Sequence, residues 1–305
     1  MGKLWLSVLL PALLLAGPAL QLEDEQPIVT QELVDYINSQ GKWKASLDWV
    51  GNMTRAQARR LTNGKVKSVQ PPEAKFGYLA QATNIPSSFD ATTEWPNCIG
   101  TIRDQGQCGS CWAFASTEVL ADRFCISEGV SVVLSPQWLV SCDTSNMGCN
   151  GGTAADTWSY LINTGVPEDS CAPYDSGASK AAGTCSYPSC SGFYTSGTAY
   201  SYSSPTAIQL AILQSGPVMA RFLVYSDFNA YSGCDIYTHL SNDTDGDGHF
   251  VKIVGWGNLN GQNYWKVANS WGEGFGCNGF FFIAFGQCGI DSQASAGQAG
   301  GYYSS

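Results

Sequence analysis

Hydrophobic and polar residues alternate differently in successive parts of the chain, and each pattern predicts a different kind of structure. Short helices are predicted at residues 31–40 and 54–61, with Thr54 as the N-cap of the second. A long helix is predicted from Cys111 to Ser127, where large apolar side chains are frequent. Beyond Gly216, apolar runs separated by Gly and Asn turns are typical of strands. These runs are residues 218–225, 249–256, 264–268 and 279–284.

The segment between these two halves has a different composition. Residues 172–205 are rich in Ser, Gly, Ala, Pro and Tyr, which predicts a loop held by disulfides. A helical half at about 97–195, followed by a β half at about 196–300, predicts an α+β fold with two lobes. A cleft between two lobes is a common place for a functional site.

The N-terminal residues have the pattern of a secretory signal. Lys3 supplies a positive charge, Leu4 to Leu15 is an apolar run, and Gly17 and Ala19 are small residues before a cut. We therefore expect residues 1–19 to be removed during export. The apolar run is too short to span a bilayer, so we expect no membrane span in the mature protein.

Charge is distributed unevenly along the chain. The formal net charge is -10, and from Ile85 onward there are 6 Lys and Arg against 18 Asp and Glu. Such an acidic surface argues against nucleic acid as a partner. The difference in charge between the nearly neutral leader and the acidic domain after it predicts that these two parts have different fates.

Cysteine usage agrees with export. Twelve cysteines in a chain with a signal peptide predict disulfides. If one is kept as a nucleophile, eleven remain, so at least one more thiol is free or pairs outside the chain. The cysteines are at positions 98, 108, 111, 125, 142, 149, 171, 185, 190, 234, 277 and 288.

The candidate chemistry is nucleophilic catalysis by a thiol. Cys111 starts the predicted long helix, whose partial positive charge favours the thiolate. The chain has two His, and His249 leads into a predicted strand that would aim its ring, whereas His239 is expected to be structural. Asn269 is placed to accept the other ring N–H of His249. Gln105 is suited to hold an oxyanion.

Two other interpretations of these motifs are weaker. Cys108 and Cys111 in Cys-Gly-Ser-Cys could form a redox pair, but that would not require His249 and Asn269 in these contexts. Residues 243–248 imitate a calcium loop, although position twelve is Val254 rather than Glu. We therefore expect no metal and no cofactor. Asn52 and Asn242 begin glycosylation sequons.

The chain resembles the papain family of cysteine peptidases, and most of all its cathepsin B-like branch. The resemblance runs from about Gln31 to Gly297. It is carried by three motifs around Cys111, His249 and Asn269, and by two more that are typical of the branch. The five are Gln-Gly-Gln-Cys-Gly-Ser-Cys-Trp (105–112), Gly-His-Phe-Val-Lys-Ile-Val-Gly-Trp-Gly (248–257), Asn-Ser-Trp-Gly (269–272), Ile-Arg-Asp-Gln-Gly (102–106) and Gly-Pro-Val (216–218).

This resemblance implies a fold, a set of site residues and an activity. The expected fold is papain-like, with a helical left lobe, a β-barrel-like right lobe and the active-site cleft between them. Residues 20–84 would be an inhibitory propeptide and residues 85–305 the mature peptidase. The expected catalytic residues are Gln105, Cys111, His249 and Asn269. The expected substrate-binding residues are Gly152, Phe250, Trp271 and Gln293, and the expected bridges are Cys98–Cys125, Cys108–Cys149, Cys142–Cys185 and Cys171–Cys190.

The resemblance also implies partners and a location. Protein and peptide substrates, the chain's own propeptide and protein inhibitors of the cystatin type are expected partners of a monomer. The expected location is the secretory pathway, leading to a lysosome or to the extracellular space. Basic leader residues Arg55, Arg59 and Arg60 are expected to pair with carboxylates of the acidic domain. The alternative function is an inactive homologue that binds peptides or inhibitors.

Departures from the cathepsin B pattern refine the expected activity. Residues 172–189 are short and contain no His, so the device that makes cathepsin B a carboxydipeptidase is absent and an endopeptidase is expected. Gln293 stands where cathepsin B has Glu, so the second subsite is expected to prefer Leu, Val or Phe over Arg, unless Asp247 makes it acidic. Phe275 replaces a Trp usual in the family. Cys234–Cys277 and Cys234–Cys288 both stay open.

Overall fold

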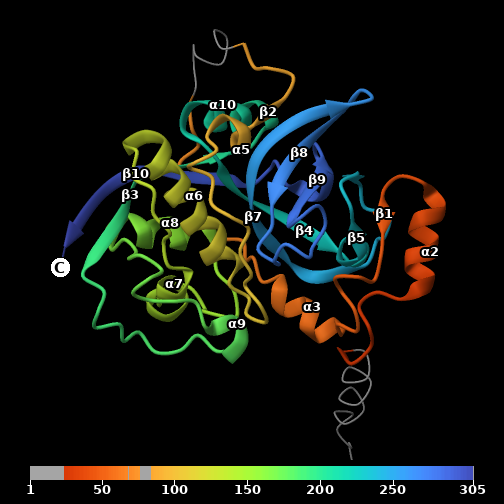
Figure 1. Ribbon diagram of the computed structural model, residues 1–305, viewed down its shortest axis with the longest axis horizontal. Coiled ribbons are helices and arrows are strands. Elements are labelled where there is room, and N and C mark those ends of the chain that lie inside the picture. The colour runs from red at the N-terminus through yellow and green to blue at the C-terminus, as the bar shows by residue number, and fades with distance from the viewer. Residues whose placement is uncertain (1–23, 68, 76–83, 305) are drawn as a thin grey trace, which may run out of the picture.

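A group of helices and a large sheet lie side by side in the computed structural model of the chain, and one end of the sheet runs along the helices (Figure 1). The structure describes residues 24–67, 69–75 and 84–304, with the backbone alone for residues 245–247. The expected signal segment at residues 1–19 lies outside the described residues. The helices of the first group are α6 (Cys111–Glu128), α7 (Pro136–Cys142), α8 (Ala154–Asn163) and α9 (Ser176–Ser179), whereas the short helix α5 (Ala91–Glu94) contacts the sheet.

A single large sheet forms the second group, with α10 (Pro205–Ser215) packed beside it. Its strands are β3 (Gly192–Tyr202), β4 (Val218–Tyr225), β6 (Ile236–Tyr237), β7 (Thr244–Leu259), β8 (Gln262–Ala268), β9 (Phe280–Ala284) and β10 (Ala294–Ser304). They follow the order β3-β10-β4-β7-β8-β9-β6, and β2 (Phe89–Asp90) pairs with β7. Within the described residues this sheet is open, so the expected barrel-like lobe does not close into a barrel.

The expectation of loop throughout residues 172–205 is wrong for its second half. Residues 192–202 form β3, which pairs antiparallel with β10. Phe193, Tyr194 and Tyr202 are buried among the Ser and Gly residues that dominated the composition. These few apolar side chains pack into the core, so tertiary packing overrides the local propensity for a loop.

Helix α6 is buried on nearly every side. From Cys111 to Phe124 only Glu118 is not fully buried. A helix buried on all faces belongs in the interior of a protein, where its charged side chains need partners. In α6, Asp122 pairs with Lys252 and Arg123 donates to the Pro217 carbonyl. The helix ends where Gly129 adopts the left-handed conformation with φ 71°. The catalytic candidate Cys111 therefore begins a helix that the surrounding core holds in place.

The leader, which comprises the described residues 24–67 and 69–75, packs on both groups. Its helices α2 (Gln31–Gln40) and α3 (Arg55–Leu61) lie where the sequence predicts them, and Thr54 closes a capping box with Gln57. Strand β1 (Lys44–Ala45) pairs with β5 (Tyr231–Ser232). Figure 1 shows α3 between the helical group and the sheet.

Five disulfides cross-link the described part of the chain. Four of them are the pairs implied by the family resemblance, and the fifth, Cys234–Cys277, decides between the two alternatives left open. Cys111 and Cys288 are free, in agreement with the parity argument. The other four are Cys98–Cys125, Cys108–Cys149, Cys142–Cys185 and Cys171–Cys190.

A buried ion cluster joins α6 to β7. The ammonium group of Lys252 lies 2.8 Å from Asp122 and 3.3 Å from Glu118, and its side chain is 1% exposed. The two carboxylates raise the pKa of Lys252 against the opposing effect of burial, so it stays charged. The cluster therefore fixes the helix that begins at Cys111 against the strand that contains His249.

Replacing Lys252 by Met should lower the free energy of unfolding by about 3–5 kcal/mol, because two buried carboxylates lose their counter-charge. Denaturant unfolding of the disulfide-intact chain measures the effect. Lys266→Met is the control, because Lys266 pairs with the more exposed Asp90 and its loss should cost less. Equal losses for the two variants would contradict the importance assigned to the buried cluster.

Candidate active site

Cys111 is the first residue of α6 and is fully buried. Its N-cap, Ser110, makes no side-chain hydrogen bond to the helix, because its hydroxyl instead lies 2.7 Å from the Tyr174 hydroxyl. The positive end of the helix dipole therefore lies at the thiol without a capping oxygen, an arrangement that favours a thiolate.

His249 and Asn269 form a hydrogen bond across two neighbouring strands. The distance from His249 Nε2 to Asn269 Oδ1 is 2.7 Å. The same Oδ1 accepts the backbone N–H of Ser270 at 2.9 Å, so it is an acceptor and Nε2 must donate. In the neutral ring Nδ1 then carries a lone pair; within the described residues it makes no hydrogen bond of normal geometry, although the Leu61 backbone lies close enough to favour its protonation. The ring is thus set up to take a proton through Nδ1.

Aromatic side chains shield this hydrogen bond from water. The Trp271 ring stacks on His249 with centroids 4.7 Å apart, and Phe222 contacts the ring edge-on. Burial is the main cause that lowers the pKa of His249 to about 4, against the opposing effect of the Asn269 hydrogen bond. The imidazole is therefore neutral while the site is covered.

Gln105 is held in one orientation beside Cys111. Its Oε1 accepts a hydrogen bond from the Ser270 hydroxyl at 2.7 Å, and its Nε2 donates to the Cys108 carbonyl at 2.9 Å. The same Nε2 lies 3.2 Å from the carbonyl oxygen of Leu61 in the leader. A carbonyl oxygen therefore occupies the place where an oxyanion is expected to be held.

The leader runs through the cleft as an extended segment. The Lys65 N–H donates to the Gly152 carbonyl at 2.9 Å, and the Gly64 N–H donates to the Gly248 carbonyl at 2.6 Å. A Cβ at Gly64 would lie 2.8 Å from that carbonyl oxygen and 3.0 Å from the Phe250 ring. Only a residue without a side chain fits this closely, so the leader covers the site with its backbone.

Burial under the leader also changes the state of the thiol. Burial raises the pKa of Cys111 to about 11. The backbone N–H groups of Phe250, Asn63 and Trp112 and the charge of Arg221 lower this pKa, but by less than burial raises it. Since Phe250 follows His249, its contact brings the backbone beside His249 to the thiol. Both the thiol and the imidazole are uncharged in this covered state.

The remaining candidate residues are placed as follows. Phe250 is buried beneath the leader, and Gln293 is half-buried, with its carbonyl accepting the Arg221 backbone N–H at 3.2 Å. The side chains of Asp245 and Asp247 lie outside the described residues, so the expectation about Asp247 stays a prediction. His239 stacks on Tyr225 and bonds Gln287, which is a structural environment.

Several contacts attach the leader to the acidic domain, among them a ring stack and the ion pairs of Arg55 and Lys67. Trp49 stacks on Trp271 with ring centroids 5.0 Å apart, a contact that the sequence did not suggest. Arg55 pairs with Asp243 at 3.2 Å. The expectation that Arg59 does the same is wrong, because Arg59 pairs with Asp24 of the leader itself. The local sequence does not predict which carboxylate forms an ion pair with a surface arginine.

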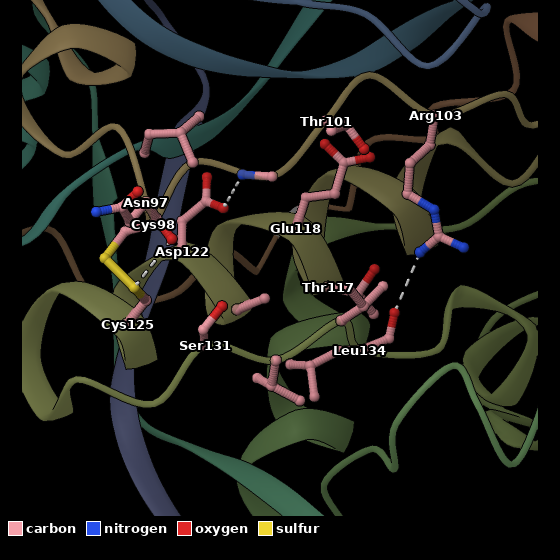
Figure 2. A pocket seen from close by; sticks show the side chains of 15 residues that line it. Asn97, Cys98, Thr101, Arg103, Thr117, Glu118, Asp122, Cys125, Ser131 and Leu134 are labelled. Carbon is pink, nitrogen blue, oxygen red and sulfur yellow. Dashed lines mark hydrogen bonds between the residues drawn. A yellow bond between two sulfur atoms is a disulfide. The ribbon is translucent and has the colours of Figure 1, made fainter.

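A partly open cavity of about 110 Å³ lies beside α6. Figure 2 shows it between the Cys98–Cys125 disulfide and Arg103, with Asp122 accepting the Gly100 N–H. Its described lining contains none of the candidate catalytic residues. The candidate site is therefore the cleft that the leader fills rather than this open cavity.

Sequence reasoning missed two residues at the site. Ser270 orients Gln105, and Arg221 of β4 reaches the leader at Gly64. Ser270 directly follows Asn269, which is a weak signal at best. Arg221 lies in an apolar strand just after the Gly-Pro-Val motif but outside it, and only the pairing of β4 with β7 brings it to the cleft.

Comparison with known proteins identifies close similarities. The family described as papain family cysteine protease matches residues 85–298. The chain is 36% identical to "Cathepsin B-like CP2" of Giardia intestinalis over 89% of this chain and 94% of that one. It is 34% identical to "Cathepsin B-like cysteine proteinase 4" of Caenorhabditis elegans, with coverage of 89% and 92%.

Solved structures agree with these relatives. The structure of "proCathepsin B S9 from Trypanosoma congolense" matches with a TM-score of 0.84 and 32% identity, over 90% of this chain and 100% of that one. The structure of "digestive procathepsin L2 proteinase from Tenebrio molitor larval midgut" matches with a TM-score of 0.74 and 29% identity, over 88% and 89%. Within the described residues, no helix combines the length and the apolar character needed to cross a membrane.

The covered thiol should react slowly with alkylating reagents. At pH 7 a pKa of about 11 in place of 9.0 lowers the thiolate fraction roughly a hundredfold. Iodoacetamide labelling of Cys111 in the full chain should be slower by at least this factor than after the leader is removed. Peptide mapping separates Cys111 from Cys288, and equal rates before and after removal would contradict the covered state.

Acid should uncover the thiol. The covered His249 has a pKa of about 4, whereas a free side chain has a pKa of 6.5. Between these two pH values the uncovered state binds a proton at His249 and the covered state does not. The covered state therefore loses stability as the pH falls from 6.5 towards 4. Labelling of Cys111 in the uncleaved chain by a thiol-directed epoxide should become faster over this range, and a constant or falling rate would contradict the linkage.

Proposed function

Because this chain belongs to the papain family of cysteine proteases, with cathepsin B-like relatives, we propose that it is the zymogen of an endopeptidase that uses Cys111 and His249. The observation that carries the proposal is the arrangement around the leader. Cys111, the His249–Asn269 pair and Gln105 converge where the leader backbone passes. An extended backbone lying over these residues is what is expected when an inhibitory segment covers a site that cleaves peptides.

The proposed reaction proceeds through a thioester. After the leader leaves, His249 Nδ1 takes the Cys111 proton, and the thiolate attacks the carbonyl carbon of the scissile peptide bond. Gln105 Nε2 donates a hydrogen bond to the oxyanion, in the place now held by the Leu61 carbonyl. The imidazolium returns its proton to the leaving amine, and the C–N bond breaks. His249 then activates water, which hydrolyses the thioester and regenerates the thiol.

Asn269 and Trp271 support this reaction without exchanging protons. The Asn269 oxygen keeps the proton on Nε2, so the lone pair of Nδ1 stays directed to the thiol. The Trp271 ring covers this hydrogen bond and excludes competing water. Removal of the leader uncovers both Trp271 and Cys111, because Trp49 and Gly64 leave together.

The leader and the cysteines support a proposal for how the protein matures and where it is sent. Residues 20–84 act as the propeptide, in line with the matching solved structures of procathepsins. Five disulfides in the described residues support passage through an oxidising compartment. We propose export by the signal at residues 1–19, with a lysosome-like or extracellular destination.

The proposed cleavage is internal because residues 172–189, the segment in which cathepsin B carries paired His, contain none here. The one cation of this segment, Lys180, is exposed at the end of α9. Gly177 of this segment packs directly against Gly106, which leaves the segment lying on the wall of the cleft. Protein chains could therefore pass through on both sides of the scissile bond.

Substitution of the histidines tests the catalytic assignment. His249→Ala should lower kcat/KM for a peptide substrate by several orders of magnitude, as should Cys111→Ala. His239→Ala should keep most of the activity, because that ring contacts Tyr225 and Gln287 instead of the thiol. The assay uses enzyme whose leader has been removed by an added protease. Equal losses at the two histidines would refute the assignment.

Product analysis tests the cleavage mode. A peptide with a free C-terminus and the same peptide with a C-terminal amide should be cut at the same internal bonds and at similar rates. Mass spectrometry of the products identifies these bonds. Release of C-terminal dipeptides from the free acid alone would show that a carboxylate anchor exists and that the proposal of an endopeptidase is wrong.

A further inference from the structure

The hydroxyl group of Tyr174 connects two chain segments that carry parts of the candidate active site. It donates to the carbonyl oxygen of Gln105 at 2.7 Å, and it lies 2.7 Å from the hydroxyl oxygen of Ser110, the residue before Cys111. A phenol has one proton and a carbonyl oxygen can only accept, so the phenol proton goes to Gln105 and Ser110 donates to the phenol oxygen. A single oxygen atom therefore joins the Gln105 backbone to the start of α6.

The segment around Tyr174 is itself held in place. The Tyr174 ring meets the Phe114 ring edge-on, with centroids 4.6 Å apart. The next two residues, Asp175 and Ser176, donate their backbone N–H groups to Oε1 of the buried Gln137 at 2.8 and 3.0 Å. Burial raises the pKa of Tyr174 above its usual value, so the hydroxyl keeps its proton and remains a donor.

Gln105 is held from the other side by Ser270. The Gln105 backbone N–H donates to the Ser270 carbonyl at 2.8 Å, and the Gln105 Oε1 accepts the Ser270 hydroxyl at 2.7 Å. A Cβ at Gly177 would lie 2.7 Å from the Gln105 carbonyl oxygen, so the segment that carries Tyr174 packs directly against this backbone. Ser270 and Tyr174 thus hold two sides of the same residue.

From this geometry we infer that Tyr174 is a positioning residue for the oxyanion, because its hydroxyl sets the place of Gln105 relative to the first turn of α6. The inference rests on the proposed peptidase function, in which Gln105 Nε2 donates to the oxyanion. Such a donor acts only at hydrogen-bond distance, so a displacement of about 1 Å weakens it severely. The role is indirect, since the hydroxyl bonds the Gln105 carbonyl and not the Nε2 donor.

The contact between Tyr174 and Ser110 leads towards the thiol, but it is not expected to change the reactivity of Cys111. Ser110 is the N-cap of α6 and makes no side-chain hydrogen bond to the helix. Its backbone, with φ -106° and ψ 15°, lies outside the extended region from which N-cap side chains bond the first helical N–H groups. A Ser110 hydroxyl released from Tyr174 therefore does not become a cap.

The substitution Tyr174→Phe tests the inference, because it removes the hydroxyl and keeps the ring. After removal of the leader, kcat for a peptide substrate should fall roughly tenfold or more with KM nearly unchanged, since the oxyanion exists only during the reaction. A peptide aldehyde should bind more weakly by a similar factor, because addition of the thiol places its oxygen where the oxyanion forms. An unchanged kcat in the folded variant would overturn the inference.

Alkylation of Cys111 distinguishes an effect on the oxyanion from an effect on the thiol. Iodoacetamide loses iodide when the thiolate attacks its methylene carbon, and this step forms no oxyanion. The alkylation rate of the leader-free enzyme and its dependence on pH should therefore be the same in wild type and in Tyr174→Phe. A slower alkylation that accounts for the whole loss of kcat would place the effect at the thiol and contradict the inference.

Three further variants assign the effect to the contact with Gln105. Tyr160→Phe removes a hydroxyl that accepts the Trp138 indole N–H in the helical group, and it should leave kcat unchanged. In a Gln105→Ala background, Tyr174→Phe should lower kcat far less than it does in wild type, and an equal loss in both backgrounds would overturn the inference. If Tyr174→Phe does not fold, Ser110→Ala decides, because it cuts the other end of the bridge and should lower kcat with alkylation unchanged.

The same measurements separate this inference from the proposed function. Hydrolysis at equal kcat by wild type and Tyr174→Phe would leave the peptidase intact and remove only the role of Tyr174. No hydrolysis by the leader-free wild type, together with no epoxide labelling of Cys111, would refute the proposed function and with it this inference.

Discussion

The buried ammonium group of Lys252 joins the two elements that carry the candidate catalytic residues. Lys252 lies three residues after His249 in β7, and its partners Asp122 and Glu118 lie in the helix that begins at Cys111. A charge in the core needs its counter-charges at short distance, so the strand cannot slide along the helix without breaking the cluster. The start of the helix at Cys111 and the strand at His249 are thereby fixed relative to each other.

Latency in this arrangement is electrostatic as well as steric. The leader excludes substrate with the backbone of residues 61–65, and the same contact removes water from Cys111 and His249. Desolvation raises the pKa of the thiol and lowers that of the imidazole, so both groups are neutral where catalysis needs an ion pair. Uncovering the site would thus restore both access and reactivity.

The sequence predicted those features that local pattern or a family motif determines. Thr54 caps α3 as predicted, and the long helix begins at Cys111. Contacts that depend on strand register could not be predicted in this way. Arg221 reaches the cleft only because β4 pairs with β7, and residues 192–202 become a strand only because β10 lies beside them. In both cases the partner is distant in the chain.

The two parts of the leader are held by forces that respond differently to acid. Trp43 packs against Tyr231 and Tyr237, and β1 adds backbone pairing, so these contacts involve no group that acid would protonate. The exposed ion pair between Arg55 and Asp243 contributes little to binding in water. The cleft segment, in contrast, lies on His249, whose protonation it opposes. Acid therefore acts on the segment that covers the site rather than on the part that anchors the leader.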